Sequence, residues 1–218
     1  ENVDSDTIVS GNSVSCFVGS GTPEHSYGRS HDLSQGVTSG LPLELSCIHF
    51  GMASLDFATT ITINVYNDID GIPGPATDEG DLLPIGSADV SIPALSEPMF
   101  FTANFASPLL LDADSMLFIE IVVPESFPGF HEIGSNDSGE NSQSWLKTTN
   151  GECGIAQWSN PSQFGFPDFS DAELYLTYDR HGTNVSKALI RSAPHSSIAQ
   201  GNGNLGVSTT IKFIKPAQ

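Results

Sequence analysis

Residues 60–67 read Thr-Ile-Thr-Ile-Asn-Val-Tyr-Asn, and polar and apolar side chains alternate along this segment. Successive side chains of a β-strand point to opposite faces, so the segment predicts a strand with its two isoleucines and its valine on a buried face. Residues 116–123 (MLFIEIVV) carry a single charge, at Glu120, which indicates a central strand. These two segments favour an all-β core.

Similar short segments recur on both sides of this pair, with turn signals such as Asp70-Gly71 between them. No window shows a convincing helical period of 3.6 residues. Many short strands of this kind predict an all-β fold, a jelly-roll-like two-sheet antiparallel sandwich with a C-terminal strand extension. The further predicted strands are 43–51, 85–92, 99–105, 172–178 and 207–215, and residues 6–18 are also strand-like.

Charge divides the chain into two parts. All 26 acidic residues lie at or before Asp179, where Arg29 and Lys147 are the basic residues, whereas residues 180–218 carry five basic residues and no acid. We therefore predict an acidic β-sandwich domain over residues 1–179 and a basic tail over 180–218, with a Gly/Asn-rich hinge at 201–204. The acidic body argues against nucleic-acid binding, because the phosphate backbone would be repelled.

The tail ends in a predicted strand, and this strand suggests a function. A basic strand joined through a hinge to an acidic sandwich can add to a sheet edge of a neighbouring molecule, and such head-to-tail contacts propagate. We predict a non-enzymatic extracellular structural subunit that polymerises with copies of itself into a filament or surface layer. An ordinary last strand of the same molecule is the competing interpretation. The predicted interface residues are Ile211, Lys212, Phe213, Ile214 and Lys215.

An acidic loop follows the strand at 60–67. Calcium binds six to eight hard oxygen ligands, and carboxylates at alternate positions beside a glycine turn can converge on one ion. The spacing begins like an EF-hand loop but lacks the later glutamate, so that motif is rejected. A solvated acidic hairpin loop is the competing interpretation. The predicted Ca²⁺ ligands are Asp68, Asp70, Asp78 and Asp81.

The aromatic residues of the second half suggest an alternative function. Exposed aromatic rings on a sandwich can stack on sugar rings while acids accept hydrogen bonds from the hydroxyls. A calcium-dependent carbohydrate-binding or adhesive module, using Trp145 and Trp158 on extracellular glycans, is therefore the alternative prediction. Ordinary core and loop packing of these aromatic residues is the competing interpretation.

Three cysteines allow one disulfide and one remaining thiol. Pairing of Cys47 with Cys153 or of Cys16 with Cys153 is favoured, and three buried thiols are the alternative. Two sequons, at Asn136 and Asn184, would accept glycans in a secretory pathway. We expect an extracellular or cell-surface protein.

No motif of an enzyme stands out. The six histidines show no HxH or HExxH spacing, and no nucleophile elbow, phosphate-binding loop or dinucleotide fingerprint is present. His31 and Asp32 are adjacent, so in a strand they would face opposite sides and could not easily act as a pair. No segment approaches the ~20 apolar residues of a membrane-spanning helix. We predict that the protein is not an enzyme.

Six segments stand out together: SYGRSHDLS (26–34), CIHFGMAS (47–54), ITINVYND (61–68), MLFIEIVVPE (116–125), GSNDSGENSQSWLK (134–147) and CGI (153–155). In combination they resemble an uncharacterised β-sandwich domain of secreted bacterial surface proteins. The resemblance covers roughly residues 26–178, although His31 stands where the family has an aromatic residue and Trp145 where it has tyrosine. It implies a non-enzymatic extracellular role and supplies no established ligand.

Overall fold

The computed structural model describes residues 8, 13–33, 43–70, 72, 74–75, 80–112, 115–136, 144–164, 170–171, 174–180 and 207–213. These residues form strands and two short 3-10 turns, η2 (Glu152–Gly154) and η3 (Pro161–Phe164), and no α-helix occurs among them. No helix in this part of the chain is long and apolar enough to cross a bilayer.

The first sheet is entirely antiparallel and has the order β4-β3-β6-β1-β9. Its strands are β1 (His25–Asp32), β3 (Thr59–Asp68), β4 (Leu82–Ile92), β6 (Met116–Val123) and β9 (Ser144–Thr148). As predicted, β6 lies centrally, between β3 and β1. Six of its eight residues are buried, and five of these are consecutive, from Leu117 to Ile121.

The second sheet has the order β11-β12-β2-β5, and β7 pairs with the end of β2. Its strands are β2 (Leu43–Leu55), β5 (Met99–Leu111), β7 (His131–Ile133), β11 (Leu174–Arg180) and β12 (Val207–Phe213). A separate two-stranded ladder joins β8 (Ser135–Asn136) to β10 (Ser170–Asp171).

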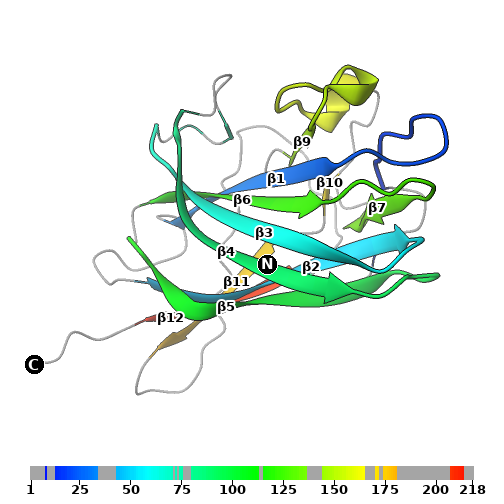
Figure 1. The fold of residues 1–218 in the computed structure, drawn as a ribbon. Helices are drawn as coiled ribbons and strands as arrows, with labels where there is room; N and C mark the ends of the chain where they lie inside the picture. Colours follow the sequence, from blue (N-terminus) through cyan, green and yellow to red (C-terminus); the bar gives the residue numbers. More distant parts are fainter. Residues whose placement is uncertain are drawn as a thin grey trace, which may run out of the picture.

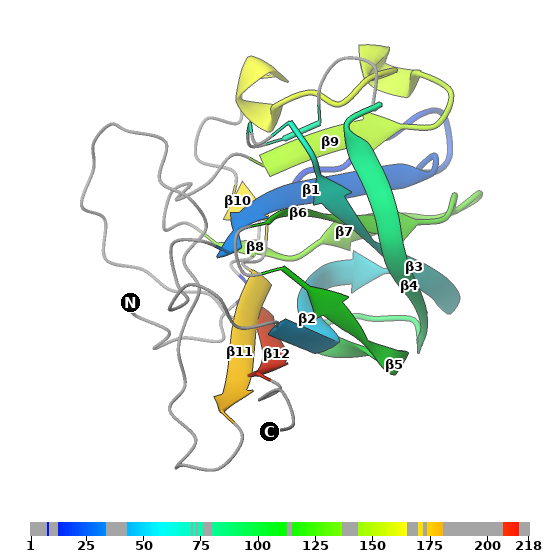
Figure 2. The same cartoon turned by 90° about the vertical axis from the view of Figure 1, so that its left-hand side faces the viewer.

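The two sheets lie face to face as two layers (Figures 1 and 2). Between them lies one hydrophobic core, to which β3 contributes Ile61, Ile63 and Val65, each with an exposed fraction of 0%. These are the residues that the alternation in 60–67 assigns to the buried face. The predicted two-sheet antiparallel sandwich is therefore confirmed, with one parallel pair, β11 and β12, within it.

Some strands differ from their predicted extents. β5 continues to Leu111 and β2 to Leu55, because backbone pairing extends past the apolar part of each segment. The strand-like segment 6–18 contains no strand among its described residues, and only Val18 makes a bridge there, to Gly21. Tertiary contacts, such as the hydrogen bond from the Tyr27 hydroxyl to the Val14 carbonyl, hold this segment instead.

The tail strand β12 lies between β11 and β2 of its own chain. It runs parallel to β11 and antiparallel to β2, with Ile211 opposite Leu45 and Lys212 opposite Glu44 in the ladder with β2. Of the predicted interface residues, Ile211, Lys212 and Phe213 are in β12, whereas Ile214 and Lys215 lie outside the described residues.

Candidate metal centre

Three aspartates gather where β3 leads into β4. Asp68 is the last residue of β3, Asp70 lies in the connection, and Asp81 immediately precedes β4. The Ile69 amide donates a hydrogen bond to the Asp81 carbonyl (3.0 Å), which brings the two ends of the connection together. One carboxylate oxygen from each aspartate lies within 4.8 Å of the others, so this cluster could hold a metal ion. Asp78, the fourth predicted ligand, lies outside the described residues.

Burial distinguishes these aspartates from an ordinary acidic loop. Asp68 is 3% exposed and Asp81 is 8% exposed, while Asp70 is exposed. Both carboxylate oxygens of Asp68 are buried without a hydrogen-bond donor in normal geometry. A buried carboxylate without donors is costly, because it loses its hydration and gains nothing in return. A cation at this position would supply the missing partner.

The electrostatics of Asp68 point in the same direction. Burial raises the pKa of the Asp68 carboxyl from 3.8 to about 7, the adjacent Asp70 and Asp81 carboxylates add to this increase, and the Gly74 backbone opposes it. The site therefore disfavours the negative charge of Asp68 when no cation is present. A bound cation would reverse this preference.

The loop of this cluster rests on β9. Gly74 has a φ of 101°, and a Cβ atom at this position would overlap the indole ring of Trp145. Asp70 Oδ1 accepts a hydrogen bond from the Ile72 amide (2.8 Å), which shapes the first part of the same loop. Glycine is required at position 74 both by the backbone conformation and by the close approach. Trp145 is thus a packing partner of the aspartate loop, and the sequence pattern alone did not indicate this role.

Both tryptophans are half-buried. The Trp158 ring packs edge-on against Phe118, with 5.1 Å between ring centroids, and Lys147 Nζ lies 4.8 Å from the Trp158 ring centroid. Each ring therefore has protein partners on at least one side. Glycan stacking on Trp145 and Trp158 stays a prediction.

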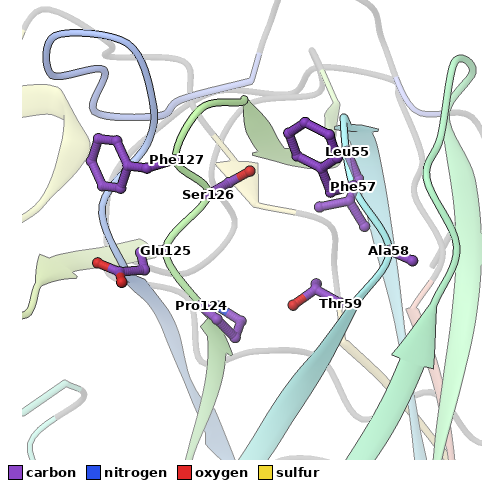
Figure 3. A pocket seen from close by; sticks show the side chains of 8 residues that line it. All are labelled: Leu55, Phe57, Ala58, Thr59, Pro124, Glu125, Ser126 and Phe127. Atoms are coloured by element: carbon purple, nitrogen blue, oxygen red, sulfur yellow. The ribbon is translucent and has the colours of Figure 1, made fainter.

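A small cleft of about 230 Å³ lies between the β2–β3 and β6–β7 turns. Figure 3 shows residues 57–59 along one wall and residues 124–127 along the other. The cleft is beside the first residue of β3, at the opposite end of that strand from Asp68. Its volume is below the ~300–1,000 Å³ of typical small-molecule sites. The aspartate cluster is therefore the stronger candidate site.

Cys16 and Cys153 form a disulfide, with a Cα–Cα distance of 6.0 Å. This is one of the two favoured pairings. Cys47 remains outside the disulfide and is buried on β2, so the alternative pairing of Cys47 with Cys153 is wrong. Cys47 lies on β2 of the second sheet, whereas Cys153 lies in η2, which follows β9 of the first sheet.

A buried histidine pair lies beside this disulfide. The Cys16 amide donates to His25 Nε2 (2.7 Å), so His25 carries its proton on Nδ1, which lies 2.7 Å from the Pro23 carbonyl and 3.0 Å from His131 Nε2. His131 Nδ1 in turn lies 2.8 Å from the Thr22 hydroxyl. Burial lowers the pKa of His25 to about 4 and that of His131 to about 3, so both are neutral. These residues are 106 positions apart, and no sequence signal links them.

β1 is buried along almost its whole length, although polar residues dominate it. Arg29 is 2% exposed and His31 is 1% exposed. Burial lowers the pKa of His31 to about 3, and the positive charge of Arg29 adds to this decrease. His31 and the half-buried Asp32 are neighbours on this strand, and the structure gives them no shared site.

Comparison of the chain with family models, with curated proteins and with solved structures found no match.

Proposed function

We propose that this protein is an extracellular, non-enzymatic β-sandwich module whose β3–β4 loop binds Ca²⁺. The observation that carries the proposal is Asp68, a 3% exposed carboxylate with both oxygens lacking hydrogen-bond donors and with two further carboxylates beside it. In this role the ion offsets most of the negative charge of the three aspartates and closes the loop. Calcium then stabilises the fold rather than serving a reaction.

The donor set favours calcium over other metals. The clustered ligands are carboxylate oxygens, and the described residues add no histidine or cysteine to them, which disfavours zinc and copper. Calcium accepts six to eight oxygens in irregular geometry, whereas magnesium demands a near-ideal octahedron. A loop with one exposed and two buried aspartates suits the less demanding ion. Asp78 is the proposed further ligand from the same connection.

The disulfide supports the extracellular part of this proposal. Disulfides persist in oxidising compartments, and the bond between Cys16 and Cys153 joins segments 137 residues apart. Free calcium is also abundant outside cells, which suits a weak or moderate site.

The test is calcium-dependent stability of the full chain. We expect CaCl₂ to raise the melting temperature of EDTA-treated protein, MgCl₂ to raise it less, and isothermal titration to give one site. Asp68→Asn removes this response, whereas Glu97→Gln, an exposed acid at the other end of β4, retains it. Identical melting curves in calcium and EDTA would exclude the site.

A second candidate function has its own observation. β12 completes the sheet between β11 and β2, and main-chain pairing on both sides holds it there. We propose that the same register can be filled by β12 of a neighbouring molecule, which would build a polymer by strand addition. Positions 44 and 179, which flank Lys212 in the two ladders, are acidic and would orient the incoming strand.

Deletion of residues 201–218 separates the two candidates. Strand addition predicts fibres or oligomers of the full chain in electron micrographs and their loss in the shortened chain, with calcium binding unchanged. A sharp monomer peak of the full chain in size-exclusion chromatography would contradict strand addition and leave the calcium proposal intact.

A further inference from the structure

Three side chains on the outer face of the second sheet form a separate cluster. Cys47 and His49 are two residues apart on β2, so they point to the same face, and Thr102 lies directly opposite His49 on β5. Cys47 Sγ lies 3.6 Å from His49 Nε2, and His49 Nδ1 lies 2.6 Å from the Thr102 hydroxyl oxygen. A thiol, a base and a group that orients the base are therefore linked by two consecutive contacts.

We propose that Cys47 is a modifiable thiol, activated by His49, that forms a mixed disulfide with a small disulfide molecule. The geometry suits this chemistry, because a nucleophile within reach of a base that a third group orients is the general arrangement for activating a thiol. The proposal does not depend on the calcium site.

Thr102 is the positioning residue of this cluster. When the thiol proton moves to His49 Nε2, both ring nitrogens carry protons, and the thiolate and the Thr102 oxygen can accept one hydrogen bond each. The ion pair is thus fully satisfied by groups already in place. His31 offers a contrast, because both of its ring nitrogens are buried without a hydrogen-bond partner.

The two direct ladder partners of Cys47 are uncharged residues. Asn104 on β5 and Thr210 on β12 are the residues opposite Cys47 in the two ladders. Neither of these two residues carries a negative charge that would oppose thiolate formation. His49 and Thr102 are half-buried and Cys47 is 9% exposed, so a small reagent fits this face better than the sulfur of another folded protein.

The reaction is an exchange. The Cys47 proton passes to His49 Nε2, and the thiolate attacks one sulfur of a disulfide R–S–S–R. The bond between the two reagent sulfurs breaks, a Cys47–S–S–R bond forms, and the leaving thiolate R–S⁻ takes the proton from the imidazolium. The reagent supplies the oxidising equivalents. An oxidising compartment, which the Cys16–Cys153 disulfide indicates, supplies such reagents.

The rate of alkylation by iodoacetamide tests the activation. Because the other two cysteines are disulfide-bonded, mass spectrometry of the native chain reports Cys47 alone. We expect a pH–rate midpoint at least about one unit below the ordinary thiol value of ~8.5. His49→Gln should return the midpoint to that value and slow alkylation at pH 7 about tenfold. Thr102→Val should raise the midpoint, and Thr102→Ser should restore it.

Asn104→Ala is the matched control, because it removes the side chain opposite Cys47 in the ladder and leaves His49 unchanged. Its midpoint should equal that of the unmodified chain. Oxidised glutathione at pH 7.5 should then add one glutathione to Cys47, about tenfold more slowly in His49→Gln. Equal midpoints with and without His49, an unreactive native thiol, or a disulfide-linked dimer in place of the adduct would each overturn the proposal.

Discussion

Gly74 and Trp145 are in direct contact, so that no side chain larger than hydrogen fits at position 74. Gly74 belongs to the loop of the aspartate cluster, and Trp145 belongs to β9 at the edge of the first sheet. The positions of the three carboxylates therefore depend on a contact between two segments about seventy residues apart in the sequence. This contact makes the loop sensitive to changes that touch no carboxylate.

Gly74→Ala should weaken the candidate metal centre without removing a ligand. The added methyl group meets the indole ring, and the φ of 101° is unfavourable for alanine, so we expect a loss of about 2–4 kcal/mol in unfolding free energy and a lower calcium affinity. Urea unfolding with and without calcium measures both. Gly19→Ala is the control, because Gly19 has a φ of 64° and no atom near its would-be Cβ. Equal losses in the two variants would show that the indole contact is unimportant.

Asp68→Asn should stabilise the protein in EDTA. The raised pKa means that the folded state holds a proton more tightly than the unfolded state, so stability is lost as the pH rises from 3.8 to about 7. An amide avoids this cost, and we expect the variant to gain at least about 1 kcal/mol at pH 8 in urea unfolding. The gain should become small at pH 3.5, where the carboxyl is mostly protonated in both states. In calcium the order should reverse, with the unmodified chain more stable. A variant that is less stable than the unmodified chain in EDTA at pH 8 would contradict this account of Asp68.

The buried histidine pair should make the fold sensitive to acid. The pKa values of His25 and His131 are lower in the folded state, so the unfolded state binds more protons below pH 6.5. Stability is therefore complete above that pH and falls as the pH drops toward about 4, by up to about 1.4 kcal/mol per pH unit for each histidine. Urea unfolding at pH 7.0, 5.5 and 4.5 measures the slope. The slope of unfolding free energy against pH reports the number of protons taken up on unfolding, and His131→Gln should reduce this number by about one. An unchanged slope would contradict the neutral assignment of His131.

Removal of the disulfide should cost several kcal/mol. The bond closes a loop between positions 137 residues apart, and the Cys16 amide also anchors His25. A double Cys16→Ala and Cys153→Ala variant should lose about 2–5 kcal/mol of unfolding free energy, as measured by urea unfolding. Reducing agent should cause a similar loss in the unmodified chain and none in the double variant. An unfolding free energy of the unmodified chain that is the same with and without reducing agent would show that other contacts hold the loop.

The sequence pattern was sufficient to predict the sandwich, because polar and apolar residues alternate in the strands that have one face toward solvent. In β3 the buried residues alternate with polar ones, and β6 is almost wholly apolar, so both strands were predicted close to their true bounds. β1 was not identified by alternation, because polar and apolar residues are both buried along it. The reason is its central place between β6 and β9.

The candidate metal centre was predicted in part. Asp68, Asp70 and Asp81 lie in one hairpin connection, so their proximity follows from a local turn, and the spacing of carboxylates was enough to suggest it. Their burial could not be predicted, because it depends on packing that includes the contact with Trp145. The cluster of Cys47, His49 and Thr102 was missed, because Thr102 comes from the neighbouring strand and its register is set by pairing across the sheet.

The order of the residues alone determined that this chain forms strands, that its charge is divided between an acidic body and a basic end, and that carboxylates gather after residue 67. These properties are counts of charged residues within a segment or periodicities over a few residues, and both are present before the chain folds. Only the tertiary structure decided which cysteines pair, that Asp68 is buried without donors, and that β12 lies between β2 and β11. Each of these depends on the distance in space between residues far apart in the chain, and packing of the two sheets sets that distance.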